Sequence, residues 1–137
     1  MSKVLVCGSR DWLDRATIRR WLEKLPPKSL VVHGAAKGAD AIADEEARAL
    51  GHITYPYPAD WKNLGNDAGP IRNQQMLDEN HDIDAVLAFT WVVEGTQGVT
   101  RGTGDMVIKA LVAGIRVTII PPRRLTAQSL TAKAGEP

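Results

Sequence analysis

Cysteine is nearly absent from this sequence, in which Cys7 is the single example. One cysteine excludes an internal disulfide and a zinc site built from several cysteines. Histidine is also scarce, and His33, His52 and His81 lack the spacing of metal ligands. We therefore expect no metal site and no required cofactor.

The sequence also lacks an excess of one charge and any long apolar run. It has 17 basic and 16 acidic residues, a net charge of +1, whereas domains that bind nucleic acid by bulk phosphate attraction are strongly basic. No apolar run approaches the roughly 18 residues of a membrane span, and residues 1–10 do not resemble a signal peptide. We expect a cytoplasmic protein with no membrane association, for which nucleic acid is a disfavoured partner.

Two common nucleotide-binding patterns are missing as well. The sequence contains no GxxxxGK[ST], and no strict GxGxxG follows its first apolar run. These absences argue against an ordinary P-loop NTPase and against a two-domain dehydrogenase.

What is present suits one globular domain. The chain has 137 residues, and 44% of them are hydrophobic, enough for one core without disulfides or metals. The last stretch is rich in Ala, Thr and Lys and has no periodicity. We expect a domain over residues 1–122 and a flexible tail over residues 123–137.

Short apolar runs alternate with segments of helical spacing along the chain. The runs predict strands at Lys3–Cys7, Ser29–His33, His52–Tyr57, Asp84–Thr90 and Arg116–Ile120. The helical spacing predicts helices at Ala16–Leu25, Asp40–Leu50, Pro70–Glu79 and Thr103–Ala113, with a loop at Pro58–Gly69. This alternation predicts the α/β class: a single Rossmann-like domain of about five mainly parallel strands with helices on both faces. Prolines favour an edge position for the third strand.

Three loops that follow predicted strands combine glycine with a cation. They are Gly8–Trp12, His33–Asp40 and Thr100–Asp105, and each precedes a predicted helix. In open parallel sheets ligands bind at the carboxyl edge. Glycine lets backbone N–H groups approach a phosphate, and helix N-termini and cations attract it. One such loop is a common turn, but three on one edge predict a phosphate site.

The cations and carboxylates of these segments admit more than one interpretation. For Arg10 we favour phosphate contact over pairing with Asp11 or Asp14. Arg72 follows Pro70 near a predicted helix start, where a cation opposes the helix dipole, so we expect an anion beside it. Asp40 suits either a helix N-cap or an acceptor for a ribose hydroxyl.

Tryptophan occurs in or beside these loops. Trp12, Trp61 and Trp91 are candidates for stacking on a base or a nicotinamide-like ring. Packing at the rim of the core is the alternative for each of them.

Several motifs resemble the YspA-like branch of the SLOG superfamily, which groups the SMF/DprA proteins with the Lonely-guy (LOG) phosphoribohydrolases. The motifs keep the family order over roughly residues 3–122: GSRDW at 8–12, HGAAKGAD at 33–40, PADW at 58–61, AGPIRNQQM at 68–76 and RGTGDM at 101–106. The resemblance implies a Rossmann-like sheet that binds a nucleotide or a nucleotide-derived ligand. With the loop cations it gives these candidates for ligand and phosphate binding: Gly8, Ser9, Arg10, Gly34, Lys37, Gly38, Asp40, Arg72, Asn73, Arg101, Gly102 and Thr103.

The sequence departs from the LOG motif PGGxGTxxE. Its Pro-Gly-Gly part is missing, residues 99–101 stand where YspA-like proteins read GGR, and an extra stretch, Val92–Gly98, precedes them. The catalytic Glu of the LOG motif falls at Met106. Asp105 and Asp40 are the remaining candidates for a catalytic carboxylate.

These observations favour binding without catalysis. The expected ligand is a phosphate-bearing, nucleotide-derived molecule such as ADP-ribose, cyclic ADP-ribose or NAD, held by a sensor or a sponge. One alternative is a LOG-like hydrolase, a nucleotide N-glycosidase or phosphoribohydrolase, and a second is a DprA-like binder of single-stranded nucleic acid. Apolar positions at Trp21 and in the Val107–Val112 helix leave room for a homodimer or a higher homo-oligomer.

Overall fold

A computed structural model describes residues 2–91 and 101–123, without the side chain of Arg101. The Val92–Gly98 stretch and residues 124–137 of the predicted tail lie outside the described residues. Five strands form one parallel sheet in the order β3-β2-β1-β4-β5. The strands are β1 (Lys3–Gly8), β2 (Leu30–His33), β3 (Ile53–Pro56), β4 (Ala85–Phe89) and β5 (Val117–Ile120). The predicted α/β class and the edge position of β3 are confirmed.

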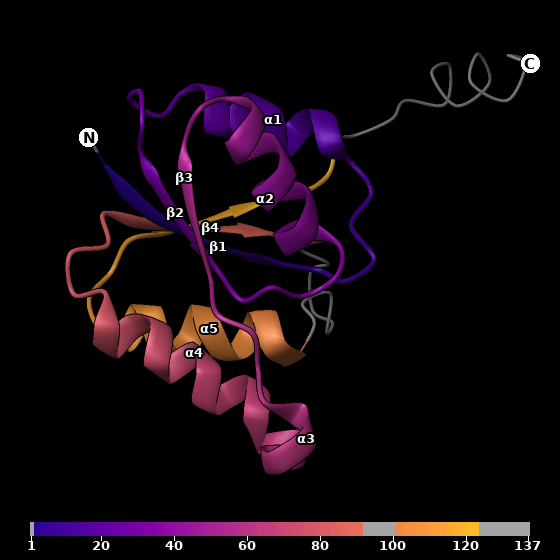
Figure 1. Ribbon diagram of the computed structural model, residues 1–137, viewed down its shortest axis with the longest axis vertical. Helices are drawn as coiled ribbons and strands as arrows, with labels where there is room; N and C mark the ends of the chain where they lie inside the picture. Colours follow the sequence, from indigo (N-terminus) through magenta and orange to yellow (C-terminus); the bar gives the residue numbers. More distant parts are fainter. Residues whose placement is uncertain (1, 92–100, 124–137) are drawn as a thin grey trace, which may run out of the picture.

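Helices cover both faces of this sheet (Figure 1). One face carries α1 (Arg15–Glu23) and α2 (Ala39–Ala49), and the other carries α4 (Ala68–Glu79) and α5 (Arg101–Val112). Alternate residues of β1 pack into the two layers: Val4 and Val6 face one core, and Leu5 and Cys7 face the other. Because both faces are covered, the strands have the continuous apolar runs from which they were predicted.

The first helix is capped by Asp14. The Asp14 carboxylate accepts hydrogen bonds from the backbone N–H of Thr17 at 3.2 Å and from the Thr17 hydroxyl at 2.5 Å. These bonds satisfy a donor that the first turn of a helix leaves without a partner.

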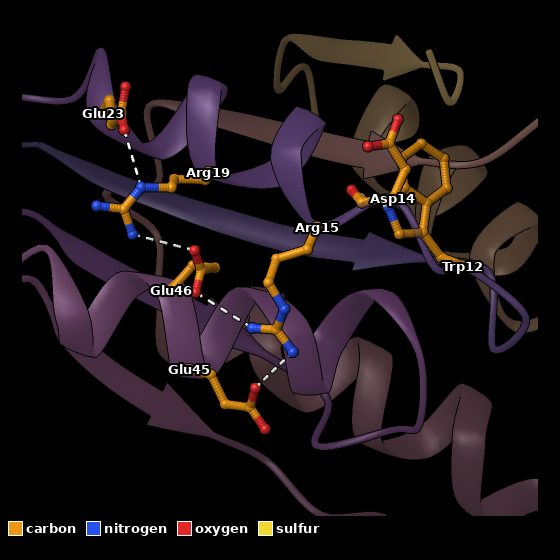
Figure 2. Close-up of polar contacts among 7 residues, drawn as sticks. All are labelled: Trp12, Asp14, Arg15, Arg19, Glu23, Glu45 and Glu46. Atoms are coloured by element: carbon orange, nitrogen blue, oxygen red, sulfur yellow. Dashed lines mark hydrogen bonds and ion pairs between the residues drawn. The ribbon is translucent and has the colours of Figure 1, made fainter. Parts of the chain in front are cut away.

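Ion pairs link α1 to α2 (Figure 2). Arg15 contacts Glu45 at 2.7 Å and Glu46 at 3.1 Å, and Arg19 contacts Glu46 at 3.1 Å. Arg19 also pairs with Glu23 within α1 at 3.0 Å. Two arginines of one helix therefore share the Glu46 carboxylate of the other.

Two of the predicted boundaries are wrong. The N-cap of α2 is Gly38, and Asp40 lies in the first turn of the helix. The predicted loop at 58–69 contains the short helix α3 (Trp61–Leu64), a 3-10 turn (Gly65–Asp67) and the start of α4. Pro70 is accepted inside the first turn of α4, because backbone N–H groups there have no partner within the helix.

The strand order creates a crevice beside β1. The chain leaves β1 for α1 on one face and leaves β4 for α5 on the other, so the loops at their carboxyl ends diverge. A Cβ atom on Gly8 would lie 2.4 Å from the Phe89 carbonyl oxygen and 2.6 Å from Ala39 Cβ. Glycine therefore permits the close approach of β1, β4 and α2 at this point. Within the described ranges, no helix combines the length and apolarity that crossing a membrane requires.

Candidate functional site

A cavity of about 640 Å³ opens at the carboxyl edge of the sheet. This volume lies within the range of roughly 300–1,000 Å³ that is typical of small-molecule sites. The end of β1, the loop after β2, α3, α4 and the start of α5 supply its walls. The candidate residues that line it are Gly8, Arg10, Gly34, Asp40, Trp61, Arg72, Asn73, Gly102, Thr103 and Asp105.

Among the candidates whose side chains the structure describes, Ser9, Lys37 and Gly38 do not line the cavity. The Ser9 carbonyl accepts the Ala39 N–H at 3.1 Å. Gly38 has a φ of +74°, and a Cβ there would lie 2.4 Å from the Ser9 carbonyl oxygen. Ser9 and Gly38 thus pack the first loop against the second. Lys37 is exposed, and the Arg101 side chain is outside the described residues.

The three candidate tryptophans have different surroundings. Trp12 is completely buried, with its rings 5.7 Å from those of both Phe89 and Trp91, so it offers no free face for stacking. Trp91 is 38% exposed and packs on Trp12 outside the cavity. Trp61 lines the cavity with 46% of its surface exposed. It packs on Gly69, where a Cβ would lie 3.2 Å from Trp61 Cη2.

Arg10 brings a positive charge to the wall of the cavity. Its guanidinium lies 5.6 Å from the centroid of the Trp61 ring, a cation–π distance. In the part of the chain that the structure describes, no carboxylate pairs with Arg10. Asp14, one of its two possible partners from sequence, accepts hydrogen bonds from Thr17 and from the Arg123 backbone.

Arg72, which comes from α4, lines the same cavity. Nη1 donates to the carbonyls of Gly34 and Tyr57, and Nε donates to Asn73 Oδ1 at 2.9 Å. Among residues 2–91 and 101–123, no hydrogen bond engages Nη2. A Cβ on Gly34 would lie 2.6 Å from Nη1, so glycine gives the guanidinium its room.

The electrostatic surroundings of Arg72 are mixed. Burial lowers the pKa of Arg72, and the nearby Arg10 charge adds to that, while Asp40 and Asp105 oppose it. An arginine nonetheless keeps its charge in proteins. The anion expected beside Arg72 is therefore present in part as these two carboxylates, and Nη2 remains available to a ligand.

Asp40 holds the loop after β2 in shape. Its Oδ2 accepts the backbone N–H groups of Gly34 at 3.1 Å and Ala36 at 3.2 Å. The Ala35 N–H between them donates to His33 Nδ1 at 3.0 Å. The sequence predicted that the amides of this loop face a phosphate, but side chains of the protein occupy these amides.

The two candidate catalytic carboxylates differ in how fully they are bonded. Asp105 accepts Lys109 Nζ on both oxygens, at 2.6 and 2.7 Å, and Asn73 Nδ2 at 3.0 Å. Asp40 Oδ1 is buried and has no hydrogen-bond partner within the described part of the chain. Burial raises the pKa of Asp40, against the effect of His33, Arg72 and the loop amides. Met106, at the position of the LOG glutamate, is wholly buried in the core.

The cavity wall also includes residues outside the list of candidates for ligand binding. Cys7 lines the cavity, and burial, with the Asp40 charge, raises the pKa of the Cys7 thiol, which therefore stays protonated. Its place follows from the period of two in β1, which puts Cys7 beside Leu5 on the α4–α5 face. Asn66 lines the cavity from the 3-10 turn, for which the sequence predicted only a loop. Residues 2–91 and 101–123 contain no His, Cys, Asp and Glu group arranged to hold a metal ion.

Comparisons with known proteins agree with this architecture. A family model described as YspA, cpYpsA-related SLOG family matches residues 2–64. The chain is 38% identical over 128 residues to the Gene 61 protein of Mycobacterium phage D29, an alignment that covers 85% of this chain and 94% of that protein. The X-ray structure of DNA processing protein A (DprA) from Streptococcus pneumoniae is similar with a TM-score of 0.65 and 20% identity over 98% of this chain. The chain spans 57% of the length of that structure, and at this identity the likeness shows the fold alone.

Proposed function

Because the chain belongs to the YspA, cpYpsA-related SLOG family, we propose that its cavity binds a phosphate-bearing, nucleotide-derived small molecule such as ADP-ribose, cyclic ADP-ribose or NAD. One observation carries this proposal. Arg10 and Arg72 bring two guanidinium groups to one cavity of about 640 Å³, and within the described residues neither forms an ion pair with a carboxylate.

The surroundings of the two arginines suit a phosphate. Guanidinium N–H groups form short, charge-assisted bonds to phosphate oxygens, often two at once. The cavity is also lined by Gly102 and Thr103 in the first turn of α5, where the helix dipole favours negative charge. Trp61 supplies an aromatic wall for a base beside Arg10.

Retention without turnover is the function that this arrangement supports best. Asp105 is held by Lys109 and Asn73, and Met106 cannot act as an acid or a base. Such a domain serves as a sensor or a sponge for its ligand. One observation favours a second candidate, N-glycosidic hydrolysis: Asp40 presents a carboxyl oxygen without a partner, and the pKa of that carboxyl is raised.

Equilibrium dialysis of the pure protein against a mixed panel, read by mass spectrometry, tests the proposal. The panel holds AMP, cytidine phosphates, NAD, ADP-ribose and cyclic ADP-ribose. We expect one compound to be retained and recovered intact. Accumulation of a free base or a ribose phosphate would instead establish the hydrolase. Retention of no compound, together with salt-sensitive binding of single-stranded DNA, would replace the proposal with nucleic-acid binding.

Binding measurements on arginine variants test whether a retained compound binds in this cavity. We expect Arg10→Ala and Arg72→Gln each to weaken binding of the retained compound by about tenfold or more, because each removes a charge-assisted contact. Arg20→Ala is the control, since Arg20 is exposed on α1 and does not line the cavity. Equal affinities in all three variants would place the binding site elsewhere.

A further inference from the structure

We infer, resting on the proposed function, that Asp40 contacts the ligand and that its Oδ1 accepts a hydrogen bond from a sugar hydroxyl next to the bound phosphates. The two oxygens of this carboxyl have separate tasks. Oδ2 accepts the amides of Gly34 and Ala36, whereas Oδ1 has no partner in the described part of the chain. Asp40 is 5% exposed and lines the cavity.

A buried carboxylate oxygen without a partner is costly. Each oxygen of an ionised carboxylate accepts about two hydrogen bonds, and most buried polar atoms in native proteins have at least one partner. Oδ2 accounts for the structural role of Asp40, because it alone receives the loop amides. Asp40 is part of the cavity wall, so a ligand in the cavity is the group that supplies the donor missing at Oδ1.

The chemistry around Oδ1 restricts what that donor is. Ala35 has a φ of +55°, which turns the amides of Gly34 and Ala36 toward one point and forms a concavity of the kind that binds anions. The carboxylate of Asp40 already fills this concavity. A phosphate is therefore excluded from it by occupancy, and the phosphates are left to Arg10, Arg72 and the start of α5.

The group that meets Oδ1 must then be an uncharged donor close to the phosphates. Arg72 Nη1 donates to the Gly34 carbonyl, and the Gly34 N–H donates to Asp40 Oδ2, so a phosphate on Arg72 places the adjoining part of the ligand near Asp40. In a nucleotide the adjoining part is the sugar, and its donors are hydroxyls. Asp40 thus sets the orientation of the ligand, with its phosphates at the arginines and its sugar against the loop after β2.

Binding of ADP and its deoxy analogues to paired variants tests this contact. Asp40→Asn keeps an amide oxygen for Gly34 and Ala36 and replaces the free oxygen by an NH₂ group. We expect the wild-type protein to bind ADP about tenfold more tightly than either 2′-deoxy-ADP or 3′-deoxy-ADP. In Asp40→Asn, affinity for ADP falls, and the discrimination against that same analogue shrinks to about twofold or less. Glu45→Gln, the same change on an exposed residue of α2, keeps the wild-type discrimination.

Each other outcome has a defined meaning. Arg72-dependent binding of ADP with equal affinity for both deoxy analogues, or unchanged discrimination in Asp40→Asn, overturns the contact and leaves the proposed function standing. No binding of ADP to the wild-type protein overturns the sugar contact, and retention of no compound from the dialysis panel overturns the proposed function as well. If thermal unfolding shows that Asp40→Asn does not fold, inosine diphosphate, which lacks the amino group of adenine, serves with the wild-type protein. Loss of affinity for inosine diphosphate but not for the deoxy analogues assigns the donor to the base and overturns the sugar contact.

Discussion

Gly8 shows how one residue without a side chain permits the site to form. A Cβ atom there would lie 2.4 Å from a carbonyl oxygen of β4 and 2.6 Å from Ala39 Cβ in α2. Neither neighbour is the end of a flexible side chain. We expect Gly8→Ala to lower the free energy of unfolding by about 3 kcal/mol, as overpacking of a core does, measured by urea denaturation.

Gly102→Ala is the matched control for this prediction. A Cβ on Gly102 meets no atom within 4 Å among the described residues, and the residue lies within α5. Alanine in a helix is favoured over glycine by roughly 0.5–1 kcal/mol. The free energy of unfolding should therefore stay the same or rise. An equal loss in both variants would show that steric contact at Gly8 is not the cause.

At this scale, chemistry was easier to predict than geometry. The position of Arg72 near a helix start already indicated an anion beside it, and Asp40 and Asp105 lie near its guanidinium. In the loop after β2 the backbone amides of Gly34 and Ala36 bind the Asp40 carboxylate and not a ligand. The sequence could not predict this arrangement, because it depends on a positive φ at Ala35, and alanine rarely adopts a positive φ. Trp12 illustrates a second limit, since a tryptophan beside a loop has the same sequence pattern in a core as in a binding site.

Helices α1 and α2 are joined by a charge cluster centred on Glu46 (Figure 2). Hydrogen bonds from Arg19, and then from Arg15, lower the pKa of Glu46, although burial acts against them. A carboxyl whose pKa is lower in the folded state contributes stability above its unfolded pKa, and this contribution is lost as the pH falls through the folded pKa. Glu46 therefore stabilises the fold at neutral pH and ceases to do so in acid.

Glu46→Gln tests this cluster. We expect the variant to unfold at a temperature a few degrees lower than the wild-type protein at neutral pH and low salt. The difference should shrink in about 1 M salt, where the Debye length is only about 3 Å, and it should also shrink below pH ~4. Thermal unfolding followed by circular dichroism gives both comparisons.

Glu45→Gln is the control for Glu46→Gln, because it removes an exposed carboxylate and not the one that two arginines share. Within the described residues Glu45 pairs only with Arg15, and both side chains are largely exposed, so its removal should have little effect. A salt-independent loss of stability in Glu46→Gln, or the same loss in Glu45→Gln, would contradict the assignment of this stability to the shared ion pair.

Elements with a clear period were predicted, and elements without one were missed. The apolar runs located all the strands of the sheet, because parallel strands covered on both faces have continuous apolar sequences. The helix α3 spans only Trp61–Leu64, too short for any helical period, and its surroundings are rich in Asp, Asn and Gly. Its one local signal was Asp60, whose carboxylate caps it through the Asn63 N–H.

At the scale of the molecule, the position of the site follows from the strand order. Alternation of strands and helices predicted a parallel sheet, but β3-β2-β1-β4-β5 is one of several orders that such a chain can adopt. This order puts the loops after β1 and β4 on opposite faces and opens the cavity between them. The net charge of +1 did not indicate that two arginines line one cavity. A net charge is a sum over the whole chain and carries no information on where the charges lie.

Association of two or more chains stays a prediction. Within the described residues α5 exposes Ile108, Leu111 and Val112. Trp21, the other position named from sequence, packs against the α1–α2 core and under the Lys24 ammonium at 4.6 Å.

Amide chemical shifts of the unmodified, nitrogen-15-labelled protein, titrated with ADP-ribose, test the central claim most directly. The account predicts that the perturbed signals cluster at Gly8, Arg10, Gly34–Asp40, Arg72 and Gly102–Thr103, with the Arg72 Nε–H signal among them. Signals on the outer faces of α1 and α2 should stay unchanged. Perturbations confined to those outer faces, or no perturbation by any nucleotide of the dialysis panel, would contradict a phosphate-binding cavity at the carboxyl edge of the sheet.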